Sequence, residues 1–115
     1  MTIWQRTLAG NLVVVGIEGR LDQSLTPELE VELDQVLVAG RREIIIDMSA
    51  VSYINSGGLR CLVTAWRRAT QQGGRLALAA MTPRVDQIVS MVGFDKVFEI
   101  YPSPGEARRA WEEEE

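Results

Sequence analysis

Apolar and polar residues recur along the chain with two periods, one typical of strands and one typical of helices. The stretches 2–8 and 12–18 read as strands, and residues 9–11 between them predict a hairpin turn. Leucine and valine then recur at helical spacing over residues 26–38, which begin with Thr26 and Pro27. Proline is favoured in the first turn of a helix, so this segment is predicted to be the first helix.

The rest of the chain alternates between the two periods. Strands are predicted at 43–48, 75–81 and 96–101, and helices at 56–72, 82–92 and 103–111. Three consecutive isoleucines at 44–46 indicate that the first of these strands lies in the interior of the sheet. Ser103 and Glu106 form a capping box for the last helix. The acidic residues 112–115 are expected to fray, because like charges repel at the negative end of a helix.

The two middle helices have clear ends and faces. Gly73 and Gly93 follow them and are predicted to stop them. The helix that begins with Thr82 and Pro83 has an apolar stripe at the spacing i, i+3, i+4 and i+7, made of Val85, Ile88, Val89 and Val92.

The order ββαβαβαβα predicts an α/β fold in a single domain that covers residues 1–115. We expect a mixed, largely parallel sheet of four or five strands, with right-handed crossovers and with helices mainly on one face. In such sheets the functional loops follow the carboxyl ends of the strands, so a site is expected in one of those loops.

The composition narrows the possible functions. The 115 residues are 46% apolar and 24% charged, as in ordinary globular domains, and the net charge of −4 argues against a nucleic-acid partner. The chain has no histidine and Cys61 is its only cysteine, which argues against disulfides, the usual zinc sites and Ser-His-Asp or Cys-His catalysis. The N-terminus lacks a signal-peptide pattern, and no stretch reaches the roughly 20 apolar residues of a membrane helix. A reduced, cytoplasmic setting without membrane insertion is expected.

Charge is unevenly distributed between two of the predicted helices. The segment 26–38 carries four acidic residues and no basic one. Between Asp47 and Asp86 there is no acidic residue, and the arginines there are Arg60, Arg67, Arg68, Arg75 and Arg84. The helix at 56–72 therefore has a cationic outer face, which is either ordinary solvated surface or a surface that binds a partner or balances a phosphate.

The segment DMSAVSYINSGGLR, residues 47–60, is the most informative part of the chain. It reads as the end of a strand, then a loop, then a helix that begins near Asn55 and Ser56. Gly57 and Gly58 follow at a cost in helix stability, which suggests that something approaches the backbone closely there. A phosphate on Ser56 would lie at the positive end of the helix dipole, one turn from Arg60. Ser56 is accordingly expected to be exposed. A plain helix start is the alternative, and no P-loop lysine or dinucleotide spacing supports a phosphate cradle.

Other polar and apolar residues near this segment have simpler interpretations. Asp22, between the second strand and the first helix, and Asp47, at the end of the third strand, are typical turn or capping residues that could also shape the field around Ser56. Trp66 and Cys61 lie on the apolar side of their helix and are interpreted as core packing. No pair of nucleophile and base can be identified, so an enzyme is not expected.

Three blocks of the sequence together resemble the STAS domain, a family named for sulfate transporters and anti-sigma factor antagonists. They are GRLD at 19–22, IIIDMSAVSYINSGGLR at 44–60 and GGRLALAAMTPRVDQIVSMVGFDKVFEIY at 73–101. The resemblance spans nearly the whole chain, in the order and length of a stand-alone antagonist. The central block is fairly specific, whereas GRLD is weak by itself.

The resemblance implies roles for particular residues. Ser56 matches the serine that a partner kinase phosphorylates, Asp22 matches the family aspartate near it, and Gly58 with Leu59 matches the end of the motif. Gly57 and Arg60 complete the expected surroundings of the phosphosite. Asn55 stands where many members have aspartate, so the chain lacks one negative charge beside the acceptor, and its quality as a kinase substrate stays open.

The resemblance also implies a function in transcription regulation by partner switching. The unphosphorylated chain would bind an anti-sigma factor of the serine-kinase type, phosphorylation of Ser56 would weaken that binding, and a serine phosphatase would reset it. ATP and magnesium would belong to the kinase, so no cofactor of this chain is implied. A non-switching adaptor subunit of a membrane lipid transporter or signalling scaffold is the alternative, mildly favoured by Asn55. A module that binds a small molecule is a third reading, whose sign would be an apolar pocket with polar groups near Ser56.

Overall fold

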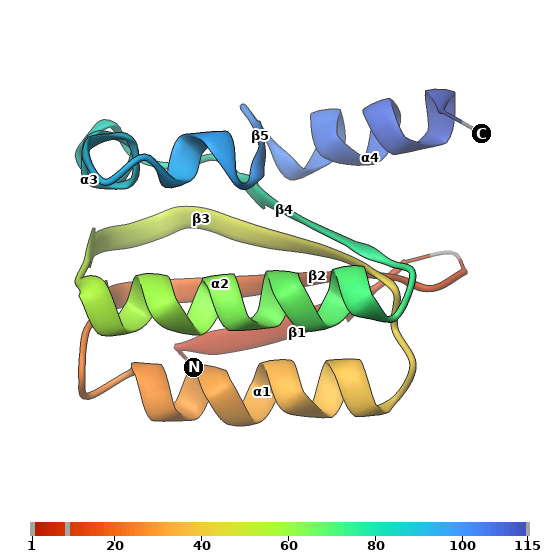
Figure 1. Cartoon of the computed structure of the whole chain (residues 1–115), viewed down its shortest axis with the longest axis horizontal. Helices are drawn as coiled ribbons and strands as arrows, with labels where there is room; N and C mark the ends of the chain where they lie inside the picture. Colours follow the sequence, from red (N-terminus) through yellow and green to blue (C-terminus); the bar gives the residue numbers. More distant parts are fainter. Residues whose placement is uncertain (1, 9, 115) are drawn as a thin grey trace.

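The computed structural model describes residues 2–8 and 10–114 and contains one five-stranded sheet with helices on both faces (Figure 1). The strands are β1 (Ile3–Thr7), β2 (Leu12–Leu21), β3 (Glu43–Ile54), β4 (Arg75–Ala79) and β5 (Glu99–Tyr101). The helices are α1 (Thr26–Val38), α2 (Ser56–Gln71), α3 (Pro83–Met91) and α4 (Pro104–Glu113), with a 3₁₀ turn at Phe94–Lys96. The predicted ββαβαβαβα order is confirmed.

The strands lie in the sheet in the order in which they occur in the chain, β1-β2-β3-β4-β5. β1 pairs antiparallel with β2, and every later pair is parallel. The sheet is therefore mixed and largely parallel, as predicted. β3 is the central strand of the sheet, and its isoleucine side chains are buried on both faces. Ile44 and Ile46 belong to one core, and Ile45 belongs to the other.

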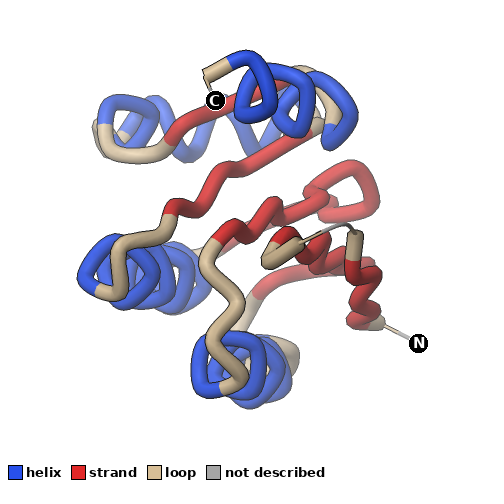
Figure 2. The backbone as a smooth tube through the Cα atoms, turned by 90° about the vertical axis from the view of Figure 1, so that its right-hand side faces the viewer, coloured by secondary structure: helices blue, strands red, loops and turns tan. Residues whose placement is uncertain are grey.

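The two faces of the sheet differ in size. The larger core packs the sheet against α1, α2 and α3 through apolar residues that include Leu29, Leu62 and Val85. Figure 2 shows α1 and α2 lying on the same side of the strands. The smaller core lies on the other face, where Ala107 and Trp111 of α4 cover the sheet. Three of the four α-helices thus share a face, which confirms the expectation that helices lie mainly on one face.

The carboxyl ends of β2 and β3 extend further than predicted. β2 was expected to end at residue 18 and β3 at residue 48, but they reach Leu21 and Ile54. The extensions pair with each other across two register shifts, and the irregularity is accommodated by Gly19, whose φ is +113°. Asp47 is consequently inside β3 and not at its end, with a side-chain oxygen that accepts from the Ser49 amide at 3.0 Å.

Later boundaries also shift. β4 ends at Ala79 and not at residue 81, and β5 covers three residues instead of six. α3 ends at Met91, and Val92, expected in its apolar stripe, is 55% exposed because the chain turns away there through Gly93 with φ +81°. The hairpin closes through the Leu8 amide and the Leu12 carbonyl at 2.9 Å, and Ala9 of the predicted turn lies outside the described residues.

The last helix is longer than predicted, because its acidic end has a partner. α4 continues past Trp111 to Glu113, and Glu114 forms an ion pair with Arg75 of β4. The helix thus continues into the tail that was expected to fray, and Glu115 lies outside the described residues. Arg75 also pairs with Glu99 at 2.9 Å, and the Trp111 indole donates to the same carboxylate at 3.0 Å. These bonds attach α4 to the sheet.

Among the described helices, none is both long enough and apolar enough to cross a membrane.

Candidate functional site at the start of helix α2

The start of α2 lies at the carboxyl edge of the sheet, where the sequence predicts a site. β3 ends at Ile54, Asn55 connects the two elements, and α2 begins at Ser56. α1 follows β2 in the same way, so both helices begin at the same end of the molecule and run side by side (Figure 1). The positive ends of two helix dipoles therefore lie next to each other.

Asn55 is the N-cap of the second of these helices, α2. Its Oδ1 accepts a hydrogen bond from the Gly58 amide at 2.9 Å, and its own amide donates to the Leu21 carbonyl at 3.1 Å. The cap satisfies one of the amides that have no partner within the helix. The second bond ties the loop after β3 to the end of β2.

Ser56 is the first residue of α2 and is exposed, as predicted. Arg60, one turn further along the helix, is also exposed. Gly58 and Leu59 are buried, and Leu59 belongs to the larger core. Of the residues named from the family motif, Ser56 and Arg60 are therefore surface groups, whereas Gly58 and Leu59 support the helix from below.

The two glycines of the motif have different surroundings. A Cβ atom on Gly58 would lie 2.8 Å from both the Cγ and the carbonyl oxygen of Leu21 and 3.1 Å from a side-chain carbon of Ile54. A Cβ atom on Gly57 would meet only Asn55 Oδ1, at 3.5 Å. The close approach that the paired glycines suggested is therefore made by the chain's own β2, at Gly58 alone. Gly57 leaves the surface beside Ser56 open.

Asp22 organises the neighbouring loop, between β2 and α1. Its Oδ1 accepts from the Ser24 hydroxyl at 2.7 Å and from the Ser24 amide at 3.0 Å, and Arg20 lies 3.6 Å from its other oxygen. These bonds, above all the one from the Ser24 hydroxyl, hold the pKa of Asp22 below its ordinary value. Its carbonyl oxygen accepts from the amides of Leu25 and Thr26. The loops that contain Asp22 and Asn55 are thus adjacent, because the Asn55 amide donates to the carbonyl of Leu21, the residue before Asp22.

A stack of one tyrosine and two arginines lies beside these loops and was not predicted from the sequence. The guanidinium carbon of Arg20 is 4.4 Å from the centroid of the Tyr53 ring, and that of Arg84 is 5.7 Å from it. Arg20 pairs with Tyr53 in the register of β2 and β3, and Arg84 is in the first turn of α3. The sequence signal was absent because the tyrosine lies in the part of β3 that was expected to be a loop.

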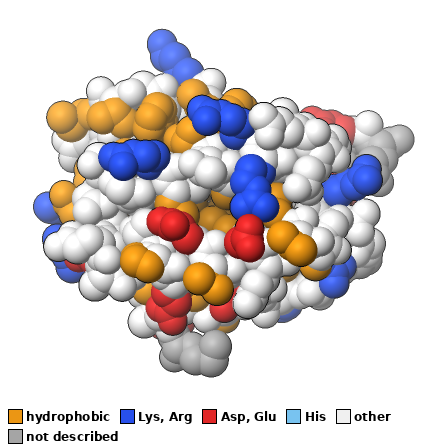
Figure 3. Space-filling model, turned by 60° about the horizontal axis from the view of Figure 1, so that its bottom comes forward, with side chains coloured by type: hydrophobic (Ala, Val, Ile, Leu, Met, Phe, Trp, Pro, Cys, Tyr) orange, Lys and Arg blue, Asp and Glu red, His pale blue; other side chains and the backbone are white. Residues whose placement is uncertain are grey.

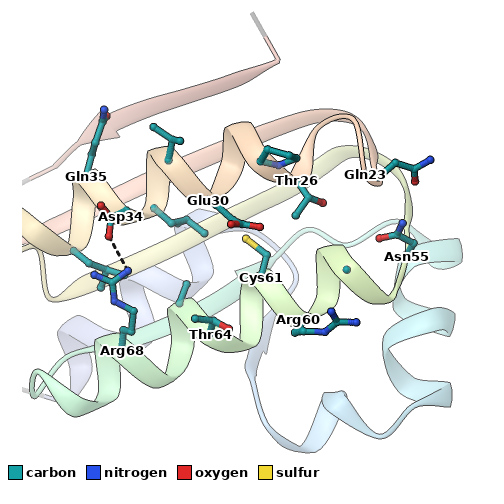
Figure 4. Close-up of a pocket in the computed structure, with 16 residues that line it drawn as sticks. Gln23, Thr26, Glu30, Asp34, Gln35, Asn55, Arg60, Cys61, Thr64 and Arg68 are labelled. Atoms are coloured by element: carbon teal, nitrogen blue, oxygen red, sulfur yellow. Dashed lines mark hydrogen bonds and ion pairs between the residues drawn. The ribbon is translucent and has the colours of Figure 1, made fainter.

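A groove with a volume of about 1010 Å³ lies between α1 and α2. Figure 3 shows acidic and basic side chains close together over a hydrophobic floor on the face that these helices form. Arg68 and Asp34 bridge the groove at 2.9 Å, while Asn55 and Arg60 lie toward its other end (Figure 4). The sign that was named for a small-molecule module is therefore present, and Glu30 in this groove is a candidate that the sequence did not reveal.

Cys61 and Trp66 have the packing roles that the sequence indicated. Cys61 is 9% exposed and lies in the larger core. Burial, together with the negative charge of Glu30, raises the pKa of the Cys61 thiol to about 11, so the thiol is protonated and weakly nucleophilic at neutral pH. Trp66 packs edge-to-face on Phe98, with ring centroids 6.4 Å apart. In the described part of the chain, no group of three or more histidine, cysteine or acidic side chains could hold a metal ion.

Comparison with known proteins gives one consistent result. The family model described as the STAS domain matches residues 4–107. An anti-sigma-B factor antagonist of Staphylococcus aureus is 27% identical over 86 residues, which are 75% of this chain and 80% of that protein. The crystal structure of an anti-sigma factor antagonist from Mycobacterium paratuberculosis superposes with a TM-score of 0.86 and 28% identity, covering 95% of this chain and 92% of that one. The Bacillus cell fate determinant SpoIIAA, solved in its phosphorylated form, superposes with a TM-score of 0.75 at 17% identity over 94% of this chain and 97% of that one.

Proposed function

Because the chain belongs to the STAS domain family, we propose that it is an anti-sigma factor antagonist that is switched off by phosphorylation at Ser56. Its partner is an anti-sigma factor of the serine-kinase type, in the bacterial cytoplasm. While Ser56 is unmodified, the chain binds that factor and so releases a sigma factor for transcription. The names of the relatives support the function, and the solved phosphorylated form of one fold neighbour supports the modification.

The observation that carries this proposal is the construction of the α2 start. Ser56 is exposed at the first helical position, and the adjacent Gly57 adds no side chain to the surface. The backbone beneath is fixed by the Asn55 cap and by the contact of Gly58 with Leu21. A kinase can therefore reach the hydroxyl without unfolding any element, and the added group changes the surface while the fold is preserved.

The reaction at this serine needs nothing from the chain except the hydroxyl. The Oγ of Ser56 attacks the γ-phosphorus of ATP held by the kinase, ADP leaves, and the hydroxyl proton passes to a base of the kinase. The product carries a charge of about −1.5 to −2 at neutral pH. The amides at the start of α2 and the exposed Arg60 tolerate this charge within the free protein. In the complex the same charge lies within the contact surface, where desolvation and repulsion weaken binding. A serine phosphatase removes it.

Asn55 makes this member differ from the charged version of the motif. It supplies the same cap that an aspartate would supply, through Oδ1 to the Gly58 amide, but adds no charge beside Ser56. This residue favours the second candidate function, a non-switching adaptor subunit of a membrane lipid transporter or a signalling scaffold. The two functions differ in a simple way, because the adaptor binds its partner with the same affinity whether or not Ser56 carries a negative charge.

The proposal is tested by calorimetric titration of the cognate partner with variants of Ser56. Ser56→Asp should weaken binding and Ser56→Ala should bind like the wild type but resist phosphorylation. Ser90→Asp adds the same charge at an exposed position on α3 and should leave affinity unchanged. Thermal melts must show all three variants folded. Wild-type affinity for Ser56→Asp would count against the switch and favour the adaptor.

A further inference from the structure

The stack of Arg20, Tyr53 and Arg84 lies at the same edge of the sheet as the start of α2. Tyr53 is three residues before Ser56. The guanidinium carbon of Arg20 is 4.4 Å from the centroid of the tyrosine ring, and that of Arg84 is 5.7 Å from it. Figure 1 shows the end of β3, the start of α2 and α3, which carries Arg84, at one end of the molecule. The proposed switch uses none of the three residues of the stack.

The fold holds this stack together from three segments that are far apart in the sequence. Arg20 is paired with Tyr53 at a register shift between β2 and β3, the kind of irregularity that re-aims side chains. Arg84 lies in the first turn of α3, and this turn is tied to β3 because the Thr82 hydroxyl donates to the Val51 carbonyl at 3.3 Å. The two guanidinium groups are therefore brought to one ring by backbone contacts.

The positive charge of the stack is only partly balanced within the chain. Arg20 has Asp22 beside it, with 3.6 Å between the arginine Nε and the carboxylate. Arg84 has no ion pair with the described residues. Asp86, the acidic residue next to it in the sequence, accepts instead from the Ser90 hydroxyl at 3.4 Å. The stack is thus a positive surface on a chain whose net charge is −4.

The position of the stack points to a protein partner and not to a free small anion. None of its three residues lines the groove between α1 and α2. A typical protein interface covers about 800 Å² of each partner, and a strand rises about 3.3 Å per residue. Tyr53 therefore lies within about 10 Å of Ser56, inside the area that a protein bound at Ser56 covers. Tyrosine and arginine are also the residue types that often dominate the binding energy of such interfaces.

We propose that the stack binds an aspartate or glutamate side chain of the anti-sigma factor kinase when that kinase is bound at the start of α2. The identity of the partner rests on the proposed function. The carboxylate accepts hydrogen bonds from Arg84, which has no carboxylate of its own, and lies in the field of Arg20. Because the ring of Tyr53 already holds both guanidinium groups, little side-chain freedom is lost on binding.

Charge reversal measures the contribution of the stack. The unphosphorylated chain is titrated with a nucleotide-bound, phosphotransfer-inactive kinase. Arg84→Glu should lower the affinity by about ten-fold or more, because it places a like charge against the partner carboxylate. Arg109→Glu makes the same charge change at an exposed position of α4, on the other face of the sheet, and should bind like the wild type. Thermal melts must show both variants folded. Wild-type affinity for Arg84→Glu, or equal losses in the two variants, would overturn the proposal.

A cross-linking experiment identifies the group that the stack binds. Lys96 is the only lysine of the chain, so few amines compete. Arg84→Lys keeps the positive charge, and a carbodiimide then joins the new amine to a carboxylate that touches it. Mass spectrometry should find residue 84 linked to an aspartate or glutamate of the kinase, whereas Arg109→Lys should give no such link. The absence of a link from residue 84 to the kinase in a complex that has formed would overturn the proposal.

These results separate the stack from the proposed function. If the wild type did not bind an anti-sigma factor kinase, the proposed function and the partner named for the stack would both be overturned. Binding by the wild type with no effect of Arg84→Glu would overturn the stack alone. Failure of the switch would appear in the Ser56→Asp titration and would leave both results at residue 84 intact.

Discussion

Helices α1 and α2 begin side by side at the same edge of the sheet, yet their first turns are built in opposite ways. α2 begins with an exposed serine, Ser56, and is capped by the side chain of Asn55. α1 begins with a buried hydroxyl, Thr26, and its N-cap residue Leu25 makes no side-chain hydrogen bond to the helix. One start has an exposed hydroxyl-bearing residue, and the other retains a buried hydroxyl without a hydrogen-bond partner in the described structure. The same position in two β–α units can therefore be open to solvent or closed inside the fold.

The largest expected effect comes from filling the contact that holds the α2 start against β2. Gly58→Ala places a methyl group 2.8 Å from the Leu21 carbonyl oxygen, so the helix must move, and the free energy of unfolding should fall by about 1–3 kcal/mol. Gly57→Ala is the matched control, because its methyl group meets only Asn55 Oδ1 at 3.5 Å. It should leave stability unchanged or raise it by up to about 1 kcal/mol. Urea unfolding of both variants measures the difference, and equal destabilisation would contradict the distinction between the glycines.

The cap of α2 should have the next largest effect. Asn55→Ala removes the bond to the Gly58 amide and should lower the free energy of unfolding by about 1 kcal/mol. Asn55→Asp keeps the bond and adds a charge at the positive end of the helix, which should raise stability by about 0.3–1 kcal/mol. Chemical denaturation provides both values. If Asn55→Ala were as stable as the wild type, the cap would have no role in fixing the backbone beneath Ser56.

Removing the buried hydroxyl of Thr26 in α1 is predicted to raise stability and not to lower it. Thr26→Val removes the unsatisfied Oγ1 but keeps the branched shape, so the free energy of unfolding should rise by about 0.5–1 kcal/mol. Reduced stability would show that the hydroxyl has a hydrogen-bond partner in solution.

The smallest expected effect is a difference in pH response between the loop before α1, which contains Asp22, and the first turn of α2. Asp22 has a pKa below its ordinary value of 3.8, chiefly because it accepts the hydroxyl and amide hydrogens of Ser24. Because the folded-state pKa is lowered, the turn is stabilised above pH 3.8, and this stabilisation is lost as the pH falls through the lowered pKa. The Ser24 amide signal should therefore titrate below pH 3.8 in NMR spectra, and Asp22→Asn should abolish the change. The Gly58 amide, bonded to the neutral Asn55, is the internal control. Titration of Asp22 above 3.8 would contradict this account.

Much of this arrangement could be predicted from local sequence patterns, and the remainder depends on contacts between distant segments. The isoleucine run placed β3 inside the sheet, and the Asn-Ser-Gly-Gly segment placed an exposed serine at a helix start. The continuation of β3 to Ile54 was missed because Ala50, Val51, Tyr53 and Ile54 pair with the irregular end of β2, which no local pattern reveals. Asn55 and Ser56 are equally good caps by type, so only the observed bond to Gly58 separates them.

Two further features, the different roles of the paired glycines and the burial of Thr26, could not be predicted from the sequence. Gly57 and Gly58 are adjacent and identical, and only the position of Leu21 makes one of them essential to packing. Thr26 looks like an ordinary residue at a helix start, and its burial follows from how closely α1 and α2 lie.

The most direct test of the switch compares the phosphorylated and unphosphorylated chains. The wild type is phosphorylated in vitro at Ser56 by the cognate kinase, the site is verified by mass spectrometry, and both forms are titrated by calorimetry against a nucleotide-bound, phosphotransfer-inactive kinase. The account predicts that phosphorylation lowers affinity by about ten-fold or more, because a charge of about −1.5 to −2 enters the contact surface. The melting temperature of the free chain should stay nearly unchanged. Equal affinity of the two forms would contradict the switch and favour a non-switching adaptor.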